Sequence, residues 1–327
     1  MPLHAFRETS GSFRTDSTIV NDLIARVRDL QRQGGLTLPL PGRGRTADRH
    51  RRLVQFARMD LSLARIAEAH ADAIAILAEQ HREGDFNALY TVWAGNGPHG
   101  TMTATPLPHG RWRLDGVKQY CSGATLADAA LVTADAAGGV LLFEVPLDVP
   151  GVSVLPSSCA SPAISDPATV PVAFAQVVLP AAALIGELNW YLKRPGFWHG
   201  AIGPAACWAG GTLSLIDAAI ATDPKDGYSR ARIGALEAIE WGLLALLDQS
   251  GVEIDADPTD EHRTARRRAL NVRHLVERWS TEVMDRFSRA TASQRLAFSH
   301  GAVGQYTALT VYIQQCHGER DLGGIRG

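Results

Sequence analysis

Apolar residues recur every three or four positions through the first part of the chain, which is the spacing of an amphipathic helix. One helix is predicted to begin at Ser17 or Thr18 and to end before Gly34, and a second helical stretch is predicted from Thr46 or Asp48 to Gly84. The apolar positions are Val20, Leu23, Ile24, Val27 and Leu30 in the first, and Leu53, Val54, Ala57, Leu61, Ala64, Ile74 and Leu77 in the second. We therefore expect an N-terminal helical domain over residues 1–87.

Two features of this part carry open interpretations. The segment Leu38–Gly44 is too rich in Pro and Gly to be helical, and it is either a plain connection or a loop that approaches a ligand. His70 and His81 lie on the second helical stretch without a partner at metal-ligand spacing. We expect both histidines at the surface or hydrogen-bonded in the core.

From residue 88 to residue 190 the pattern changes to short alternating runs, which predict β-strands. Gly-containing pairs, Asp115-Gly116 and Gly138-Gly139, are interpreted as turns between strands. These runs include Leu89–Trp93, Thr101–Thr105, Ala129–Thr133, Val140–Val145, Val152–Leu155 and Val170–Val178. About seven short strands in a row predict a middle β-domain that is a compact barrel or sandwich.

Beyond residue 190 the helical spacing returns and continues to the end. Four helices are predicted, over Trp198–Thr222, Ser229–Gln249, Glu261–Thr291 and Ser299–Gly318. Long amphipathic helices with short links form a bundle, so residues 191–327 are expected to be a C-terminal four-helix bundle. The predicted fold class is α+β with three domains.

Composition narrows the classes of partner. The formal net charge is -2, so the chain has no general attraction for nucleic acid or for anionic membranes, although residues 43–52 and 263–268 are locally basic. The most apolar stretch, Gly200–Ala221, is interrupted by Pro204 and Asp217, which argues against a membrane span. The four cysteines lie far apart without zinc-ligand spacing, which favours a cytoplasmic location over a disulfide framework or a metal site.

The stretch Lys118–Ala124 combines an aromatic ring, a hydroxyl and a glycine within a few residues. A flat polar heterocycle needs a ring to stack on, a hydroxyl at its edge and a backbone that it can approach closely. Tyr120, Ser122 and Gly123 supply these features. The alternative is a tight hairpin whose serine bonds to nearby backbone.

The same stretch resembles the middle domain of the acyl-CoA dehydrogenase superfamily. The matching positions are Gly110, Leu114, Gly116, Lys118, Tyr120, Cys121, Ser122, Ala124, Ala127-Asp128 and Leu131-Val132, followed by Val172, Phe174, Val177, Leu179 and Gly186. The resemblance extends to the helix–strand–helix order of nearly the whole chain. It implies bound FAD, with Tyr120 packed on the flavin ring and the Ser122 hydroxyl bonded to flavin N5.

The resemblance also nominates residues outside this stretch. Thr101 and Thr103 are candidates for the pyrimidine edge of the flavin, although the superfamily's preceding Thr-Glu-Pro motif is missing. Arg194 opens a helix near the family's active site. Arg230 matches an arginine that reaches the FAD pyrophosphate of a neighbouring subunit, which implies a homodimer or homotetramer.

A catalytic base is not evident. Some relatives place a glutamate just before the position of Arg194, where this chain has Lys193, and residues 291–304, where other relatives place it, contain no acid. Glu187 and Glu319 are the nearest substitutes along the chain. His317, four residues before Asp321, resembles a histidine of reduced-flavin monooxygenases with this fold, or it simply ends a helix.

Three functions follow from the resemblance. The first is FAD-dependent oxidation of an acyl-CoA or related substrate, with an electron acceptor as partner. The second is a two-component monooxygenase that depends on a separate flavin reductase. The third is a binding or assembly protein that has lost the base.

Overall fold

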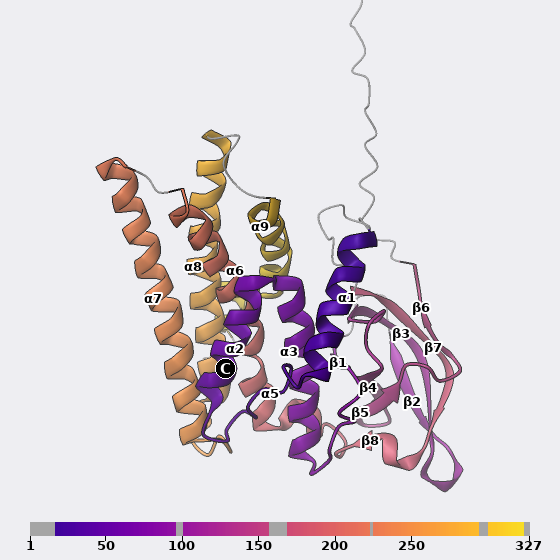
Figure 1. The fold of residues 1–327 in the computed structure, drawn as a ribbon. Helices are drawn as coiled ribbons and strands as arrows, with labels where there is room; N and C mark the ends of the chain where they lie inside the picture. Colours follow the sequence, from indigo (N-terminus) through magenta and orange to yellow (C-terminus); the bar gives the residue numbers. More distant parts are fainter. Residues whose placement is uncertain (1–16, 96–100, 157–168, 223–224, 294–299, 324–327) are drawn as a thin grey trace, which may run out of the picture.

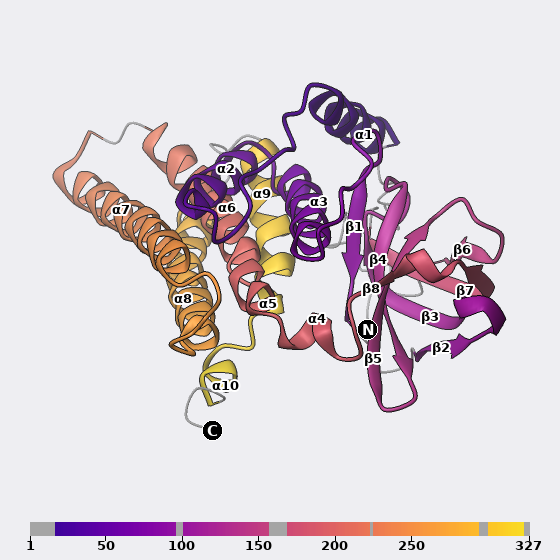
Figure 2. The ribbon, with the colours of Figure 1, turned by 90° about the horizontal axis from the view of Figure 1, so that it is seen from below.

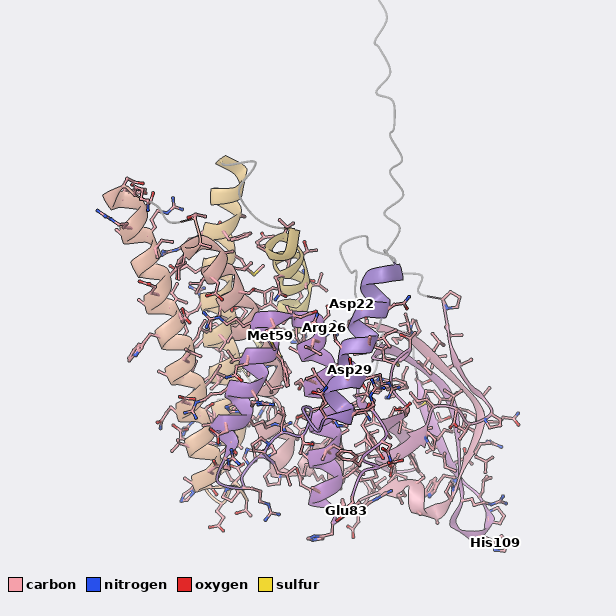
Figure 3. The ribbon with its side chains drawn as sticks, viewed as in Figure 1. Asp22, Arg26, Asp29, Met59, Glu83 and His109 are labelled. Carbon is pink, nitrogen blue, oxygen red and sulfur yellow. The ribbon has the colours of Figure 1, made fainter. Side chains whose placement is uncertain are left out.

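The computed structural model describes residues 17–95, 101–156, 169–222, 225–293 and 300–323. The described N-terminal helices are α1 (Ser17–Arg32), α2 (Thr46–Met59) and α3 (Leu61–Glu79). The second predicted stretch is thus two helices rather than one, because Asp60 has extended backbone and its side chain caps α3 by accepting hydrogen bonds from the amides of Ser62 and Leu63. Arg26 of α1 pairs with the same Asp60 at 2.9 Å, which ties α1 to this break. Figure 3 labels Arg26 on α1 and Met59, the last residue of α2.

The strands form one sheet next to these helices. They are β1 (Tyr90–Trp93), β2 (Met102–Pro106), β3 (Trp112–Ser122), β4 (Ala129–Ala136), β5 (Gly139–Pro146), β6 (Val152–Val154), β7 (Thr169–Leu179) and β8 (Leu184–Ile185). Short 3-10 turns lie at Pro108–Gly110 and Ala181–Ala183.

The order of the strands is β6-β7-β3-β2-β4-β5-β8, and β1 pairs with β4. Apolar residues from β1 to β5 and from β7 meet in one core, with Trp93, Phe143 and Phe174 among them. The sheet therefore curls around a core of its own, as expected for a barrel or sandwich. In the described residues its end strands β6 and β8 do not pair with each other, so it is a single open sheet.

The predicted turn at Asp115-Gly116 is wrong, because β3 runs through it from Trp112 to Ser122. Gly116 has φ +135, and a Cβ there would lie 2.0 Å from the carbonyl oxygen of Thr101. The glycine is therefore needed for close approach of two strands and not for a turn. The predicted turn at Gly138-Gly139 is confirmed between β4 and β5.

The C-terminal helices are α4 (Trp190–Lys193), α5 (Pro195–Gly200), α6 (Gly203–Ile220), α7 (Gly227–Ala256), α8 (Ala265–Ser293), α9 (His300–Tyr312) and α10 (Glu319–Leu322), with a 3-10 turn at Ile313–Gln315. One apolar core joins α2 and α3 to α6, α7, α8 and α9. At Gly210 the α6 backbone touches α2, since a Cβ there would lie 2.3 Å from the carbonyl oxygen of Val54.

Figures 1 and 2 show the arrangement. The helices α6 to α9 and α2 lie on one side, the sheet lies on the other, and α3 stands between them beside β1. Among the described helices, none has the length and apolar character needed to cross a lipid bilayer. The domain boundaries at residues 87 and 190 stay a prediction.

Candidate functional site

Tyr120 and Ser122 lie on the outer face of β3 at an irregularity of the strand. The register of β3 with β7 shifts between Lys118 and Cys121, so that both of these side chains face the core of the sheet although they are three residues apart. A β-bulge of this kind re-aims neighbouring side chains. Here the side chain of Tyr120 is left 64% exposed, and Ser122 faces α3.

Ser122 stands where the sheet meets two helical segments. Its Oγ accepts a hydrogen bond of 2.8 Å from Nη2 of Arg65 on α3, and it lies 3.1 Å from the hydroxyl of Thr169 on β7. The Arg65 guanidinium lies over the ring of Tyr312 at the end of α9, 4.6 Å from its centroid. The contacts of Arg65 therefore connect α3, the sheet and the C-terminal helices at one point.

The backbone around Ser122 is held from behind. The Ser122 carbonyl oxygen accepts hydrogen bonds from Trp93 Nε1 at 3.0 Å and from the Thr91 hydroxyl at 2.8 Å. Gly123 has φ +74, and a Cβ there would meet nothing closer than the Thr91 side chain at 3.9 Å. An exposed aromatic ring, a hydroxyl and an unobstructed glycine backbone are features that a flavin ring fits.

Lys118, part of the same motif, has a structural role. Its Nζ donates a hydrogen bond of 2.8 Å to the hydroxyl of Thr133 inside the sheet, and burial lowers the pKa of the Lys118 ammonium to about 8. The Thr133 hydroxyl in turn donates to the carbonyl oxygen of Ala94. Lys118 thus links three strand segments behind the face that carries Tyr120 and Ser122.

A stripe of carboxylates on α3 was not predicted from the sequence. Glu68, Asp72 and Glu79 lie along the helix that carries Arg65, and each meets a glycine of the antiparallel segment α5–α6. A Cβ on Gly203 would lie 2.8 Å from Glu68, and a Cβ on Gly200 would lie 3.1 Å from Asp72. A Cβ on Gly196 would lie against Glu79. The three glycines leave room for the carboxylates. A signal existed in the sequence, because these acids and Arg65 interrupt a stretch that is otherwise mostly Ala, Leu and Ile.

Glu68, a member of this stripe, has a strongly shifted pKa. Desolvation raises the pKa of the Glu68 carboxyl well above its usual range, and the neighbouring Asp72 carboxylate raises it further. Asp72 itself pairs with the buried Arg49 at 2.7 Å. A carboxyl group with a raised pKa, one turn along α3 from Arg65, is a candidate for proton transfer.

Glu68 lies among aromatic and charged side chains. Burial raises the pKa of the Cys207 thiol and of the Tyr312 hydroxyl, and the Glu68 charge adds to both shifts. The rings of Tyr312 and Trp208 are 6.1 Å apart in an edge-to-face arrangement. Arg273 lies over Trp208 at 4.7 Å. Trp208 and Cys207 are fully buried, so these side chains belong to the core that joins the helices.

Arg194 is not brought together with Ser122. Its Nη1 pairs with Glu79 at 2.5 Å, at the opposite end of α3 from Arg65. Fourteen residues of helix separate Arg65 from Glu79, which corresponds to roughly 21 Å. The two predicted site residues therefore lie in different regions of the molecule.

The other candidates are also dispersed. Thr103 lies opposite Asp115 on β3 and donates a hydrogen bond to its carbonyl oxygen. Thr101 lies beside Gly116. Gly116 is six residues of strand before Ser122, which corresponds to roughly 20 Å. Arg230 is exposed on α7, which lies on the far side of the helices from the sheet (Figure 1).

His317 precedes α10 rather than ending a helix. Its Nδ1 lies 3.1 Å from the Asp321 carboxylate, so these two side chains are paired. The exposed side chain has 64% of its surface accessible, and no contact with the Ser122 region is observed in the described residues. Among the described residues, no three His, Cys, Asp or Glu side chains are grouped to hold a metal ion.

Known structures share this architecture over nearly the full chain. A dibenzothiophene monooxygenase from Paenibacillus sp. A11-2, in complex with FMN and indole, matches with a TM-score of 0.75 and 16% identity over 93% of this chain and 94% of that chain. A nitrososynthase from Micromonospora carbonacea var. africana matches at 0.73 and 18% over 95% and 93%. A glutaryl-CoA dehydrogenase from Mycobacterium smegmatis, in complex with FADH2, matches at 0.70 and 14%, over 96% of each chain.

The chain has the acyl-CoA dehydrogenase fold. The resemblance noted in the sequence is thus confirmed at the level of the fold, with sequences that have diverged widely. No protein-family model and no curated protein matches the sequence. The sequence motif that carries the resemblance lies on the bulged strand β3.

Proposed function

We propose that the protein is a flavin-dependent oxidoreductase that holds the flavin ring against Tyr120 and Ser122. The observation that carries the proposal is the bulge in β3, which presents both side chains and the open backbone of Gly123 where the sheet meets α3. Structures with the same fold bind FMN or FADH2. A bound flavin supplies the two-electron chemistry that no amino-acid side chain provides.

In this proposal each residue has a defined task. Ser122 donates or accepts a hydrogen bond at the polar edge of the ring, and Arg65 orients the Ser122 hydroxyl and adds a positive charge. Tyr120 offers its ring as a stacking surface. The substrate occupies the aromatic surroundings between α3 and α6, where Glu68 gives or takes a proton. Arg230 contacts a flavin phosphate across a subunit interface.

Monooxygenation with flavin reduced by a separate enzyme is our first choice of reaction. Lys193 stands where some relatives have the base, and it lies next to Arg194, which pairs with Glu79 at the opposite end of α3 from Arg65. Monooxygenation does not need a base that removes a proton next to a thioester carbonyl. The dibenzothiophene monooxygenase with the same fold holds the flat aromatic molecule indole, which suits the aromatic surroundings of Tyr312 and Trp208.

Dehydrogenation of an acyl-CoA is the second choice, and Glu68 favours it. A carboxylate base must lie near the flavin, and Glu68 is one helical turn from the arginine that contacts Ser122. Its raised pKa makes the Glu68 carboxylate a stronger base than an ordinary exposed glutamate. In this reaction an electron acceptor is the partner.

The experiment begins with titration of the purified protein with FMN, FAD and their reduced forms. We expect saturable binding that Ser122→Ala weakens about fivefold, the worth of one hydrogen bond. Ser153→Ala, at an exposed serine of β6, is the matched control and should leave the affinity unchanged. Absence of binding by any flavin would refute the proposal and leave a binding or assembly role.

A second step separates the reactions. With NADH, a flavin reductase and indole, oxygen incorporation into indole identifies a monooxygenase. Anaerobic bleaching of bound FAD by butyryl-CoA identifies a dehydrogenase.

A further inference from the structure

A pocket of about 540 Å³ lies at the other end of α3 from Ser122. Four segments that are distant in sequence form it: the loop Pro41–Arg43, Glu79 at the end of α3, the helices α4 and α5, and the turn Pro258–Thr259 between α7 and α8. We call it the Arg194 pocket, after the buried arginine in its wall. The loop is part of Leu38–Gly44, so the interpretation of that segment as one that approaches a ligand is open again.

The loop wall of the pocket is firmly held. Gly42 packs on the turn between α7 and α8, since a Cβ at Gly42 would lie 2.7 Å from Cβ of Pro258. The Asp255 carboxylate accepts hydrogen bonds from the amides of Gly44 and Thr46 and from the Thr46 hydroxyl, at 2.6 to 3.0 Å. The loop is therefore fixed to the end of α7.

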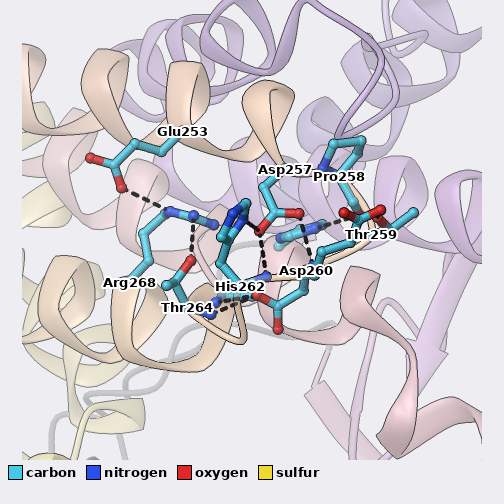
Figure 4. Close-up of polar contacts among 11 residues, drawn as sticks. Glu253, Asp257, Pro258, Thr259, Asp260, His262, Thr264 and Arg268 are labelled. Carbon is cyan, nitrogen blue, oxygen red and sulfur yellow. Dashed lines mark hydrogen bonds and ion pairs between the residues drawn. The ribbon is translucent and has the colours of Figure 1, made fainter.

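The turn itself is braced by its own polar network (Figure 4). Asp257 accepts from the amides of Glu261 and His262 and pairs with the His262 ring at 2.9 Å. Asp260 accepts from the amides of Thr264 and Ala265 at the start of α8. A pocket with walls held in this way binds ligands without first having to order them.

Arg194 has hydrogen-bonding capacity that the described protein does not use. Only 7% of its surface is exposed, and its guanidinium lies over the rings of Trp190 and Tyr191, at 5.7 and 5.2 Å from their centroids. Nη1 pairs with Glu79 at 2.5 Å, while Nε has no hydrogen-bond partner among the described residues. A buried guanidinium with a spare donor is costly unless a further acceptor is supplied.

The charged side chains around the pocket are mostly positive. Lys193 and Arg43 line it with exposed side chains, and together with Arg194 they supply three positive charges. Glu79 is the one carboxylate among the lining residues, and Arg194 already pairs with it. The rest of the lining includes Trp190 and Pro195, which offer apolar surface.

We propose that the Arg194 pocket binds a small organic anion, namely a carboxylate or phosphate group attached to a flat apolar body. Arg194, Lys193 and Arg43 attract the charged group, and Trp190 contacts the apolar body. The site is separate from the proposed flavin site, because roughly 21 Å of α3 lies between Arg65 and Glu79. It does not depend on flavin binding.

Isothermal titration calorimetry on the full chain tests the proposal with benzoate and phenyl phosphate as probes and neutral benzamide as the comparison. We expect saturable binding of at least one anion, at least tenfold tighter than benzamide. Binding of benzoate alone identifies a carboxylate ligand, and binding of phenyl phosphate alone identifies a phosphate ligand. Either result supports the proposal.

Variants locate the binding. Arg194→Lys keeps a positive charge beside Glu79 but removes the planar fork, and we expect the anion to bind at least tenfold more weakly. The double variant Lys193→Gln with Arg43→Gln changes only exposed side chains, so it should fold, and it should weaken binding several-fold. Arg45→Gln is the matched control, because Arg45 lies two residues after Arg43 and does not line the Arg194 pocket, but lines a neighbouring pocket with Arg43, Arg51 and Arg52.

Three results would overturn the proposal. They are no saturable binding of either anion, equal affinity for benzamide, and weakening by Arg45→Gln as large as that by Arg194→Lys. The last result would place the anion on the neighbouring arginines. Flavin titration of the same protein is read separately, so failure of one proposal does not imply failure of the other.

Discussion

Arg65 and Ser122 form the contact on which the proposed site depends, a hydrogen bond of 2.8 Å between α3 and β3. The two residues are 57 positions apart in the chain. Because Arg65 also lies over the Tyr312 ring, one side chain holds the sheet, the N-terminal helices and the C-terminal helices in a common geometry. The flavin site that we propose exists only when these three parts are in place.

Replacement of Arg65 tests this role. Arg65→Met keeps the aliphatic stem and removes the hydrogen bond to Ser122 and the cation–π contact with Tyr312, so we expect the free energy of unfolding to fall by about 2 kcal/mol. Urea denaturation measures the change. Arg52→Met is the control, because Arg52 also lies over an aromatic ring, Phe56 at 5.7 Å, but is exposed. Equal losses in the two variants would mean that Arg65 is an ordinary surface arginine.

Glu68 should make stability depend on pH. Its folded pKa is raised, so the folded protein binds a proton that the unfolded chain releases above pH 4.5. This contribution to stability is complete below pH 4.5 and is lost as the pH rises through the folded pKa. Glu68→Gln stays neutral, and at pH 8 we expect it to be more stable than the parent by about 1 kcal/mol or more.

Chemical denaturation at pH 5 and pH 8 is the measurement. Glu83→Gln serves as the control, since Glu83 is exposed beyond the end of α3 (Figure 3). If Glu68→Gln is less stable than the parent at pH 8, the Glu68 carboxylate is stabilising when charged and the interpretation fails.

The buried His70 should make the protein less stable in mild acid. Its Nδ1 accepts a hydrogen bond of 3.1 Å from the Tyr90 amide, and burial lowers its pKa to about 4. The unfolded chain takes up a proton near pH 6.5 and the folded protein does not, so stability falls as the pH drops from 6.5 toward 4.

Between pH 7 and pH 5 this difference amounts to about 2 kcal/mol for His70. His50, buried with its pKa also lowered to about 4, adds a similar amount. His70→Gln should therefore lose about half as much stability as the parent over this range, as measured by denaturation at each pH. His81→Asn, at an exposed histidine, should behave as the parent does. An unchanged acid sensitivity in His70→Gln contradicts the assignment.

Gly116 should tolerate no side chain. A Cβ would lie 2.0 Å from the Thr101 carbonyl oxygen, and φ is +135, so Gly116→Ala is expected to lower the free energy of unfolding by about 3 kcal/mol or more. Gly234→Ala is the contrast, because no atom lies within 4 Å of its Cβ position in α7, and there a gain of up to about 1 kcal/mol is expected. Thermal denaturation distinguishes the two, and a mild effect at Gly116 would mean that β2 and β3 are not in close contact.

Local sequence patterns were sufficient to predict most of the helices and strands. Period-two alternation predicted most strands, and helical spacing predicted the long C-terminal helices, because each pattern reports which face of an element is buried. Two local signals were misleading. Asp115-Gly116 has the composition of a turn but accommodates a strand contact, and Asp60 divides a continuous helical pattern by capping the second half.

Local sequence patterns predicted only some of the residues of the candidate site. Tyr120, Ser122 and Gly123 are close enough in the chain to form a motif, and the structure keeps them together at the C-terminal end of β3. Arg65, Glu68 and Tyr312 were missed, since they come from α3 and α9 and meet only after packing. Arg194 and Ser122 were assigned to one site by resemblance, yet the length of α3 keeps them apart.

The amino-acid sequence by itself determined the order of helices and strands and the motif on β3, because these follow from the spacing of apolar residues and from a few neighbouring side chains. Only the tertiary structure decided which charges face each other across α3, α5 and α6. The physical reason is that desolvation and pairing depend on the contacts between helix faces, and a glycine such as Gly203 shows its purpose only when the carboxylate of Glu68 lies against it.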